Sequence, residues 1–519
     1  MKRIKKNFYG TGRIAALLMM LCLIPALLTA GCGSSSDGDK EQLLLKVSSV
    51  DDLEGKKIGV QLGTTGDIYV SDYEGDDAGT VIERYNKGND AAQALAQDKI
   101  DAVVIDEEPA KAFVNANPQL VILGDEFANE DYAICIGKDK PELKAKINSA
   151  LAELSKDGTL SNIKRNYLGE DDEKGSFPYE KKDVTRDNGE LIVATNAEFK
   201  PYEYYDNGEM TGFDIDMMQA VCDILGMELK MEDMQFDSII NAVQSGKADV
   251  GASGMTITED RLKNIDFTDS YINAKQVIVV KDPNIKAVKL TFKEKLYQNF
   301  IEGKRWTYLT KGLLNTFIIS IAAAVMGILI GFIVAMIRSW HDKNGGLSIA
   351  NFICHVYLTI IRGTPAIVQI LIIYYVICAS VNVNKLVAAI LAFGINSGAY
   401  VAEIIRSGIM SIDNGQFEAG RSLGLSFTKT MTNIVLPQAF RNVLPALANE
   451  FIVLIKETSV SGYIGLVDLT KGGDIIRSIT YEPLLPLLAV ACIYLVIVMA
   501  LSTGVSKLER RLSNDGRRK

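Results

Sequence analysis

The sequence predicts two successive folds, an α/β part before residue 285 and an all-α transmembrane part after residue 312. In residues 44–285, short apolar runs such as Lys57–Val60 and Ala102–Ile105 alternate with amphipathic helical stretches. This alternation is typical of α/β domains. The run Leu313–Ile337 carries no charge, and it is long enough to cross a hydrocarbon core about 30 Å thick as a tilted helix.

The composition excludes several classes of function. The chain has 519 residues, too many for one ordinary domain, and 48% of them are hydrophobic. Its 55 Lys and Arg against 64 Asp and Glu give a net charge of -9, which disfavours nucleic-acid binding because phosphates attract clustered positive charge. The seven cysteines form no CxxC pair, and there are only two histidines. We therefore predict no metal site, no disulfide framework and no enzymatic activity.

Residues 1–31 have the layout of a secretory signal peptide. Lysines and arginines precede the apolar run Ile14–Leu28, and Thr29–Cys32 is followed by a Gly-Ser stretch. Small residues before a cysteine resemble a bacterial lipoprotein cleavage box, which implies acylation of Cys32 and an outward-facing linker at 32–43. The alternative is an uncleaved signal anchor.

Five transmembrane spans are predicted in residues 313–506, and an interfacial helix and linker precede them at 286–312. The predicted spans are Leu313–Ile337, Thr364–Val383, Leu386–Ile405, Asn442–Val460 and Pro483–Ser506. We expect Leu347–Ile361 to extend the second span, since it is too short to cross alone. An odd number of spans reverses sides, so an outward N-terminal part puts the basic tail at 507–519 in the cytoplasm, as the positive-inside rule requires.

A polar segment between the third and fourth predicted spans resembles a known coupling motif. Gln416–Leu425 looks like the EAA loop of permease subunits in ATP-binding-cassette (ABC) importers, in which a short helix seats in a cleft of the ATPase. The matching residues are Glu418, Ala419 and Gly424 within this segment and Pro437 after it. Gly420 stands where alanine is usual, a change that we expect to be tolerated sterically. The alternative is an ordinary connecting loop with a helix C-cap at Gly424.

Arg362–Pro365 and Gly398–Glu403 also resemble the polar-amino-acid branch of these permeases, so the resemblance covers nearly the whole membrane region. It implies a type I importer permease at 313–506 that works as a homodimer or beside a sister permease. It also implies a separate ABC ATPase subunit, because the chain lacks a Gly-x-x-x-x-Gly-Lys-Ser/Thr phosphate loop. ATP and Mg²⁺ would bind that partner, and this chain would hold no cofactor.

Residues 44–285 resemble the periplasmic amino-acid-binding proteins, which have two lobes hinged around a ligand. In that family the segments run in another order: first the one like Gly189–Val280, then those like Val50–Lys138 and Pro141–Gly169. One full set is present, so the resemblance implies a circularly permuted type II binding domain with a new linker at 170–188 rather than two tandem domains. We expect the ends of this domain, at Leu44 and Lys281, to emerge together near the hinge.

An amino-acid zwitterion needs a cation for its carboxylate and an anion for its ammonium, because an unpaired buried charge costs several kcal/mol. The resemblance places Arg261 at the carboxylate, aided by Thr256 and Gly254. It places Asp106 at the ammonium. The other residues that match binding positions are Gln61, Thr65, Asn196, Phe199 and Phe236. Taken singly, each has an ordinary alternative: an ion pair with neighbouring acids for Arg261, a helix N-cap for Asp106 and core packing for Phe236.

Together these features predict a binding and permease subunit in the cell membrane that captures a polar amino acid outside and passes it inward. Asn196 stands where many relatives carry Asp, which weakens the case for a cationic ligand and leaves glutamine-like or other polar side chains open. An amino-acid-gated channel and a membrane-anchored amino-acid sensor are the alternatives. The channel would need a re-entrant pore segment and no ATPase-coupling loop.

Overall fold

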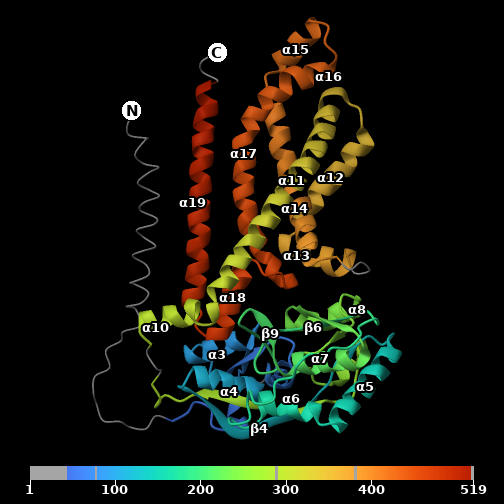
Figure 1. Cartoon of the computed structure of the whole chain (residues 1–519). Coiled ribbons are helices and arrows are strands. Elements are labelled where there is room, and N and C mark those ends of the chain that lie inside the picture. Colours follow the sequence, from blue (N-terminus) through green and yellow to red (C-terminus); the bar gives the residue numbers. More distant parts are fainter. Residues whose placement is uncertain (1–43, 76–78, 287–289, 379–382, 516–519) are drawn as a thin grey trace, which may run out of the picture. The chain divides into compact units, whose positions relative to one another are not determined.

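The computed structural model describes residues 44–75, 79–286, 290–378 and 383–515 (Figure 1). Leu45–Lys519 form one compact unit, with an α/β part followed by a helical part. The predicted signal peptide, the predicted lipidation site Cys32 and the linker at 32–43 lie outside the described residues.

The first lobe of the α/β part, residues 45–132 and 272–281, is built on a five-stranded sheet with the order β2-β1-β3-β13-β4. Its strands are β1 (Lys57–Gln61), β2 (Val81–Tyr85), β3 (Ala102–Asp106), β4 (Leu120–Tyr132) and β13 (Ile272–Lys281), and its helices are α2 (Thr65–Val70), α3 (Gly88–Ala96) and α4 (Glu107–Ala116). β1 is parallel to β2 and β3, whereas β13 lies antiparallel between β3 and β4. The apolar run of β3 is buried along its whole length, as expected of a central strand.

The second lobe, residues 133–271, has a sheet with the order β10-β6-β11-β5-β12. Its strands are β5 (Cys135–Ile136), β6 (Glu190–Thr195), β10 (Glu228–Asp233), β11 (Val250–Gly251) and β12 (Asp266–Phe267), with a small separate sheet of β7 (Glu198–Phe199), β8 (Glu203–Asp206) and β9 (Glu209–Thr211). Its helices are α5 (Pro141–Lys156), α6 (Thr159–Leu168), α7 (Phe213–Leu225), α8 (Ile239–Gln244) and α9 (Glu259–Asn264). The segment 170–188 joins α6 to β6 without a regular element, as its polar composition predicts.

The chain passes between the lobes after β4 and again before β13, at the paired residues Tyr132 and Ile272. The two ends of the α/β part lie close together at the opposite end of the first sheet, where Lys46 Nζ is 2.8 Å from Asp101 Oδ1 and Lys281 Nζ donates to Ala96 O at 2.9 Å. The expectation that these ends emerge near the hinge is therefore wrong. β13 runs its full length away from the crossover before the chain leaves the sheet.

The helical part contains α10 (Phe292–Leu296), α11 (Trp306–Asn344), α12 (Ser348–Gly363), α13 (Ala366–Ile372), α14 (Lys385–Met410), α15 (Asn414–Ser422), α16 (Phe427–Thr430), α17 (Leu436–Glu457), α18 (Leu469–Thr480) and α19 (Leu484–Asp515). Among the described residues, α11, α14 and α19 are each long and apolar enough to cross a membrane. α11 and α14 approach closely because Gly331 has no side chain: a Cβ there would lie 2.8 Å from Ala402 N.

One expectation about the spans needs correction. Ser348–Gly363 does not continue the second span in a straight line, because it meets Ala366–Ile377 at an angle of 111°. The two pieces count as one further span only if they are taken together. The bend falls at Thr364 and Pro365, where the proline holds the preceding residue in an extended conformation. α17 is helical across the predicted fourth span, and it is less apolar than α11, α14 and α19 because it carries Arg441, Glu450, Lys456 and Glu457.

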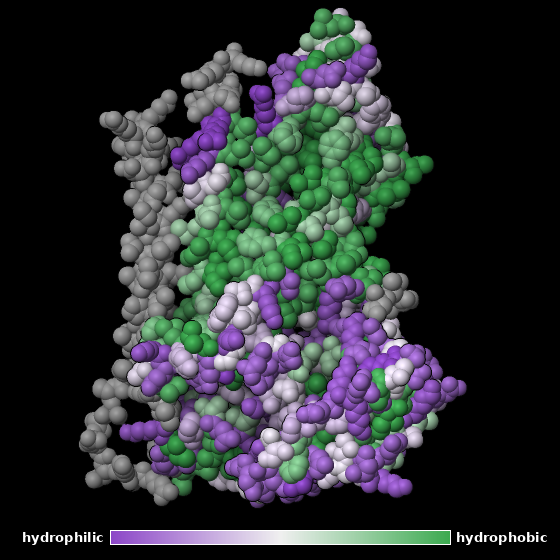
Figure 2. Space-filling model, in the orientation of Figure 1, coloured by the Kyte–Doolittle hydropathy of each residue, from purple (hydrophilic) through white to green (hydrophobic). Residues whose placement is uncertain are grey.

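Large apolar side chains are exposed along the helical part. Leu329 on α11, Phe352 on α12 and Val496 on α19 are each more than half exposed, and the face of these helices seen in Figure 2 is mostly hydrophobic. Exposed apolar surface on long apolar helices indicates contact with lipid.

Candidate functional site

A small, nearly closed cavity lies between the two lobes. The first lobe contributes Gln61, Thr64, Thr65 and Asp106, and the second contributes Phe199, Phe236, Ser253, Gly254, Thr256 and Arg261. Asn196 is buried directly beside it, and its Oδ1 accepts a hydrogen bond from Gln61 Nε2 at 3.3 Å. All the residues predicted to bind a ligand are thus brought to one place. The sequence reasoning had not singled out Thr64 and Ser253.

The ends of the strands bring these side chains together. Gln61 and Asp106 are the last residues of the parallel strands β1 and β3, and Asn196 directly follows β6. Because the carboxyl ends of parallel strands meet at one edge of a sheet, each lobe presents its polar residues to the same crevice. Arg261 reaches the crevice from α9, whose N-cap is Thr258.

Arg261 is 7% exposed and spans the crevice. Its guanidinium donates to Thr256 O at 2.7 Å within the second lobe and to Gly63 O at 2.9 Å in the first lobe, and it stacks over the Phe236 ring. Burial lowers the pKa of Arg261 below its ordinary value. The alternative of a surface ion pair with Asp260 is wrong, because Asp260 pairs with Lys263 instead.

Asp106 is 5% exposed and lines the cavity from the first lobe. The hydroxyl of Tyr132 donates a hydrogen bond to its carboxylate. Burial, together with the nearby charge of Glu130, raises the pKa of Asp106 to about 7. The residue precedes α4, but its side chain makes no capping hydrogen bond there. It therefore presents an acceptor that a cation in the cavity would stabilise in its ionised form.

A layer of buried polar groups behind the cavity was not predicted from the sequence. Glu130 is 4% exposed, and its Oε2 accepts hydrogen bonds from Thr256 Oγ1 at 2.8 Å and Gln276 Nε2 at 3.2 Å. Glu130 and Tyr132 alternate along β4, so both point toward the same face of the strand. The sequence offers two signals for this buried layer. One is the alternation of Glu130 and Tyr132, and the other is Gln276, a glutamine just before the apolar run of β13.

Two buried carboxyls hold the backbone loop that carries Gly254. Gly254 N donates to Asp214 Oδ2 at 2.9 Å, and Ser253 Oγ donates to Glu203 Oε1 at 2.5 Å. Burial raises the pKa of Asp214 to about 7 and that of Glu203 well above its ordinary value. Gly254 itself has φ +50°, and a Cβ there would lie 2.9 Å from the Phe199 ring. The loop therefore needs glycine at this position.

The predicted coupling segment forms α15, which ends in a turn with φ +77° at Gly424. Glu418 and Ala419 are exposed, whereas Phe417 and Gly420 are buried. A Cβ on Gly420 would lie 2.6 Å from Thr430 Oγ1. The glycine in place of the usual alanine thus leaves room for Thr430 on α16, and Glu418 and Ala419 lie on the exposed face of α15.

Two lobes that close over a buried Arg and a buried Asp, followed by long apolar helices, define a solute-binding domain fused to a membrane permease. The chain belongs to the bacterial extracellular solute-binding proteins, family 3, whose model matches residues 191–464. It is 38% identical over 208 residues to a putative glutamine transport system permease protein of Rickettsia typhi, covering 40% of this chain and 93% of that protein. It is 39% identical over 207 residues to the glutamine transport system permease protein of Escherichia coli strain K12, covering 39% and 92%.

A solved structure of an amino acid ABC transporter with histidines is 36% identical and covers 43% of this chain and 100% of that chain, with a TM-score of 0.39. By its family match and its permease relatives, the chain joins a solute-binding part to a permease part.

Proposed function

We propose that this protein captures a polar amino acid outside the membrane and passes it inward as the binding and permease subunit of an ABC importer. The observation that carries the proposal is the pair Arg261 and Asp106, buried on opposite walls of one small cavity. Among the described residues, neither side chain has an ion-pair partner within 4.0 Å. An α-carboxylate at Arg261 and an α-ammonium at Asp106 would neutralise both charges.

The remaining contacts favour an uncharged polar side chain. Phe199 and Phe236 line the cavity, and the amide groups of Gln61 and Asn196 meet at its edge. An amide can donate to and accept from another amide, whereas a cationic side chain would lack a further carboxylate on the cavity wall. Because relatives are named as glutamine permeases, L-glutamine is the first ligand to test.

The α/β part is best explained as one circularly permuted type II binding domain at 44–285, with its new joint at 170–188. Each sheet takes strands from both sides of that joint: β5 joins β6, β10, β11 and β12, while β13 joins β1 to β4. Two tandem domains would not mix strands in this way.

The membrane arrangement follows from the same proposal. Five spans in 313–506, including α17, leave the tail at 507–519 in the cytoplasm, with the binding domain outside and Cys32 lipidated. The exposed Glu418 and Ala419, with the turn at Gly424, would dock a separate ATPase that holds ATP and Mg²⁺. A homodimer of the chain would complete the pathway and cover part of the exposed apolar surface.

Reconstitution with an ATPase subunit tests the proposal. L-Glutamine is expected to stimulate ATP hydrolysis, and Arg261→Gln and Glu418→Ala should each abolish the stimulation, the first by losing the ligand and the second by losing the coupling. The bent pair α12 and α13 has the geometry of a broken span or a re-entrant loop, which is what the channel alternative needs. An amino-acid-dependent ion current without ATP would therefore overturn the importer proposal.

A further inference from the structure

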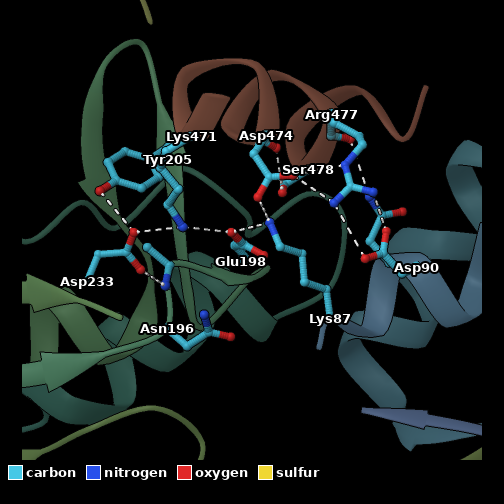
Figure 3. A network of polar contacts seen from close by, with 12 residues as sticks. Lys87, Asp90, Asn196, Glu198, Tyr205, Asp233, Lys471, Asp474, Arg477 and Ser478 are labelled. Atoms are coloured by element: carbon cyan, nitrogen blue, oxygen red, sulfur yellow. Dashed lines mark hydrogen bonds and ion pairs between the residues drawn. The ribbon is translucent and has the colours of Figure 1, made fainter. Parts of the chain in front are cut away.

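A network of buried charges joins α18 to both lobes of the binding domain (Figure 3). Lys471 Nζ lies 3.0 Å from Glu198 Oε1 and 3.3 Å from Asp233 Oδ2, both in the second lobe. One helical turn further along α18, Asp474 pairs with Lys87 of the first lobe, and Arg477 pairs with Asp90 of the same lobe. The helix therefore contacts the two lobes through different side chains.

The charges at the centre of this network are almost fully buried. The side chains of Lys471, Asp233, Glu198 and Lys87 are 3%, 3%, 4% and 6% exposed. Burial by itself lowers the pKa of Lys471, but Asp233 and Glu198 outweigh it and hold that pKa well above its ordinary value. Leaving a buried charge without its partner costs several kcal/mol. The contacts therefore stabilise the structure most when all of them form together.

The network contains an ion pair across the cleft itself. Lys87 precedes α3 in the first lobe, and its Nζ lies 2.7 Å from Glu198 Oε1 in the second lobe. Lys471 binds the same oxygen of Glu198. Opening of the lobes would separate Lys87 from Glu198 and break the chain of alternating charges. The complete network thus requires a closed cleft.

The second-lobe end of the network is continuous with the ligand cavity. Ala197 N donates to Asp233 Oδ1 at 3.0 Å, and Asn196 Nδ2 donates to Met234 O at 2.9 Å. Glu198 lies between Ala197 and Phe199 in the chain. Lys471 therefore contacts Glu198 within the segment 196–199 and also Asp233, which accepts the hydrogen bond from Ala197 N. This segment carries two residues at the cavity, Asn196 and Phe199, whereas Lys471 does not line the cavity.

The other side of α18 is fixed to the first membrane helix. A Cβ on Gly472 would lie 2.6 Å from Tyr308 O on α11, so only glycine allows this approach. Leu469 N donates to Thr316 Oγ1 at 3.1 Å, and Asn315 Nδ2 donates to Val467 O at 2.8 Å. A movement of the lobes that shifts α18 is therefore passed to α11.

We propose that Lys471 is a positioning residue of the amino-acid site and that α18 registers closure of the cleft through the Lys471–Glu198–Lys87–Asp474 chain. The inference rests on the proposed function of the cavity. A ligand that closes the cleft strengthens the contacts of α18 with the lobes by some factor. Because binding linkage is reciprocal, those contacts raise the affinity of the cavity for the ligand by that same factor. Part of the amino-acid affinity thus resides in the permease half of the chain.

The test is the affinity of the full-length chain in nanodiscs for L-glutamine, or for whichever amino acid the wild type binds most tightly. Lys471→Met is expected to raise Kd by about tenfold, within the roughly 5- to 150-fold range typical of coupled sites. Lys471→Arg keeps the charge and should lose clearly less affinity than Lys471→Met. Lys295→Met is the matched control, because Lys295 forms an ion pair with Glu482 outside the network.

Asp474→Asn provides a second variant in case Lys471→Met does not fold. It removes the negative charge that pairs with Lys87 while Lys471 stays in place, and it should also weaken ligand binding. Unchanged Kd values in Lys471→Met and Asp474→Asn overturn the inference, as does an equal loss in Lys471→Arg and Lys471→Met. If the wild type binds no amino acid at all, the proposed function fails, and this outcome is distinct from the other two.

Discussion

Replacing Asp106 with Asn tests whether this carboxylate binds the ammonium group of the ligand. The side chain is 5% exposed, and Asn is nearly the same size and can still accept the hydrogen bond from Tyr132. What the variant loses is the charge. Removing one partner of a buried ion pair costs about 3–5 kcal/mol, which corresponds to a rise in Kd of roughly one hundred to several thousand-fold.

The same carboxyl gives binding a pH dependence of defined sign. Burial and the neighbouring Glu130 raise the pKa of Asp106 to about 7, and a bound ammonium group lowers it. Affinity is therefore full above about pH 7 and is lost as the pH falls, by up to about tenfold for each pH unit. Isothermal titration of the full-length chain at a series of pH values measures both effects.

The Asp106→Asn variant should bind weakly at every pH and show a flatter profile than the wild type. Residual dependence would reflect Asp214, whose pKa burial also raises to about 7. The reasoning is refuted if Asp106→Asn binds as tightly as the wild type. It is equally refuted if wild-type affinity stays constant from well below to well above pH 7.

Three further predictions concern other parts of the chain. Arg261→Lys should raise Kd at least about tenfold in the same titration, because a single ammonium cannot replace the paired donors of a guanidinium. Gly420→Val should leave ligand binding unchanged but abolish ligand-stimulated ATP hydrolysis, because the new side chain would collide with Thr430. Gly504→Val is the control and should leave that hydrolysis intact, because a Cβ at Gly504 has no atom within 4 Å. Glu203→Gln should raise the melting temperature more at pH 8 than at pH 5. Burial raises the pKa of Glu203, so the wild type loses stability as the pH rises and the glutamine variant does not. Each kcal/mol of this difference corresponds to about 2–4 °C.

Much of the cavity could be predicted from the sequence because its residues lie in short continuous segments. Gln61 with Thr65, and Thr256 with Arg261, keep their spacing wherever the segments stand in the chain, so a permuted order does not hide them. Glu130 could not be recognised in the same way. Its role depends on β4 lying beside β13, a pairing between residues more than a hundred positions apart.

The membrane part was less predictable for two physical reasons. α17 carries Arg441, Glu450, Lys456 and Glu457, so hydropathy alone does not mark it as a membrane span, although the helix forms. The direction of the chain after Gly363 depends on a local break at Thr364 and Pro365, and hydropathy alone contains no information about the resulting 111° bend. The ends of the binding domain were misplaced for a similar reason, because the sequence does not show how far β13 continues beyond the crossover at Ile272.

The chemistry of the α18 contact determines what kind of signal it can carry. An apolar patch would hold either lobe whenever it came near, since hydrophobic contacts are not directional. Lys471, by contrast, is buried between Glu198 and Asp233, and Glu198 in turn needs Lys87 from the other lobe. When one lobe is displaced, a buried charge loses its partner, which costs several kcal/mol. When both lobes are in place, the attraction between the paired charges offsets the cost of burying them. Buried ion pairs therefore restrict the contact to the closed form of the domain, which under the proposed function is the form that holds the amino acid.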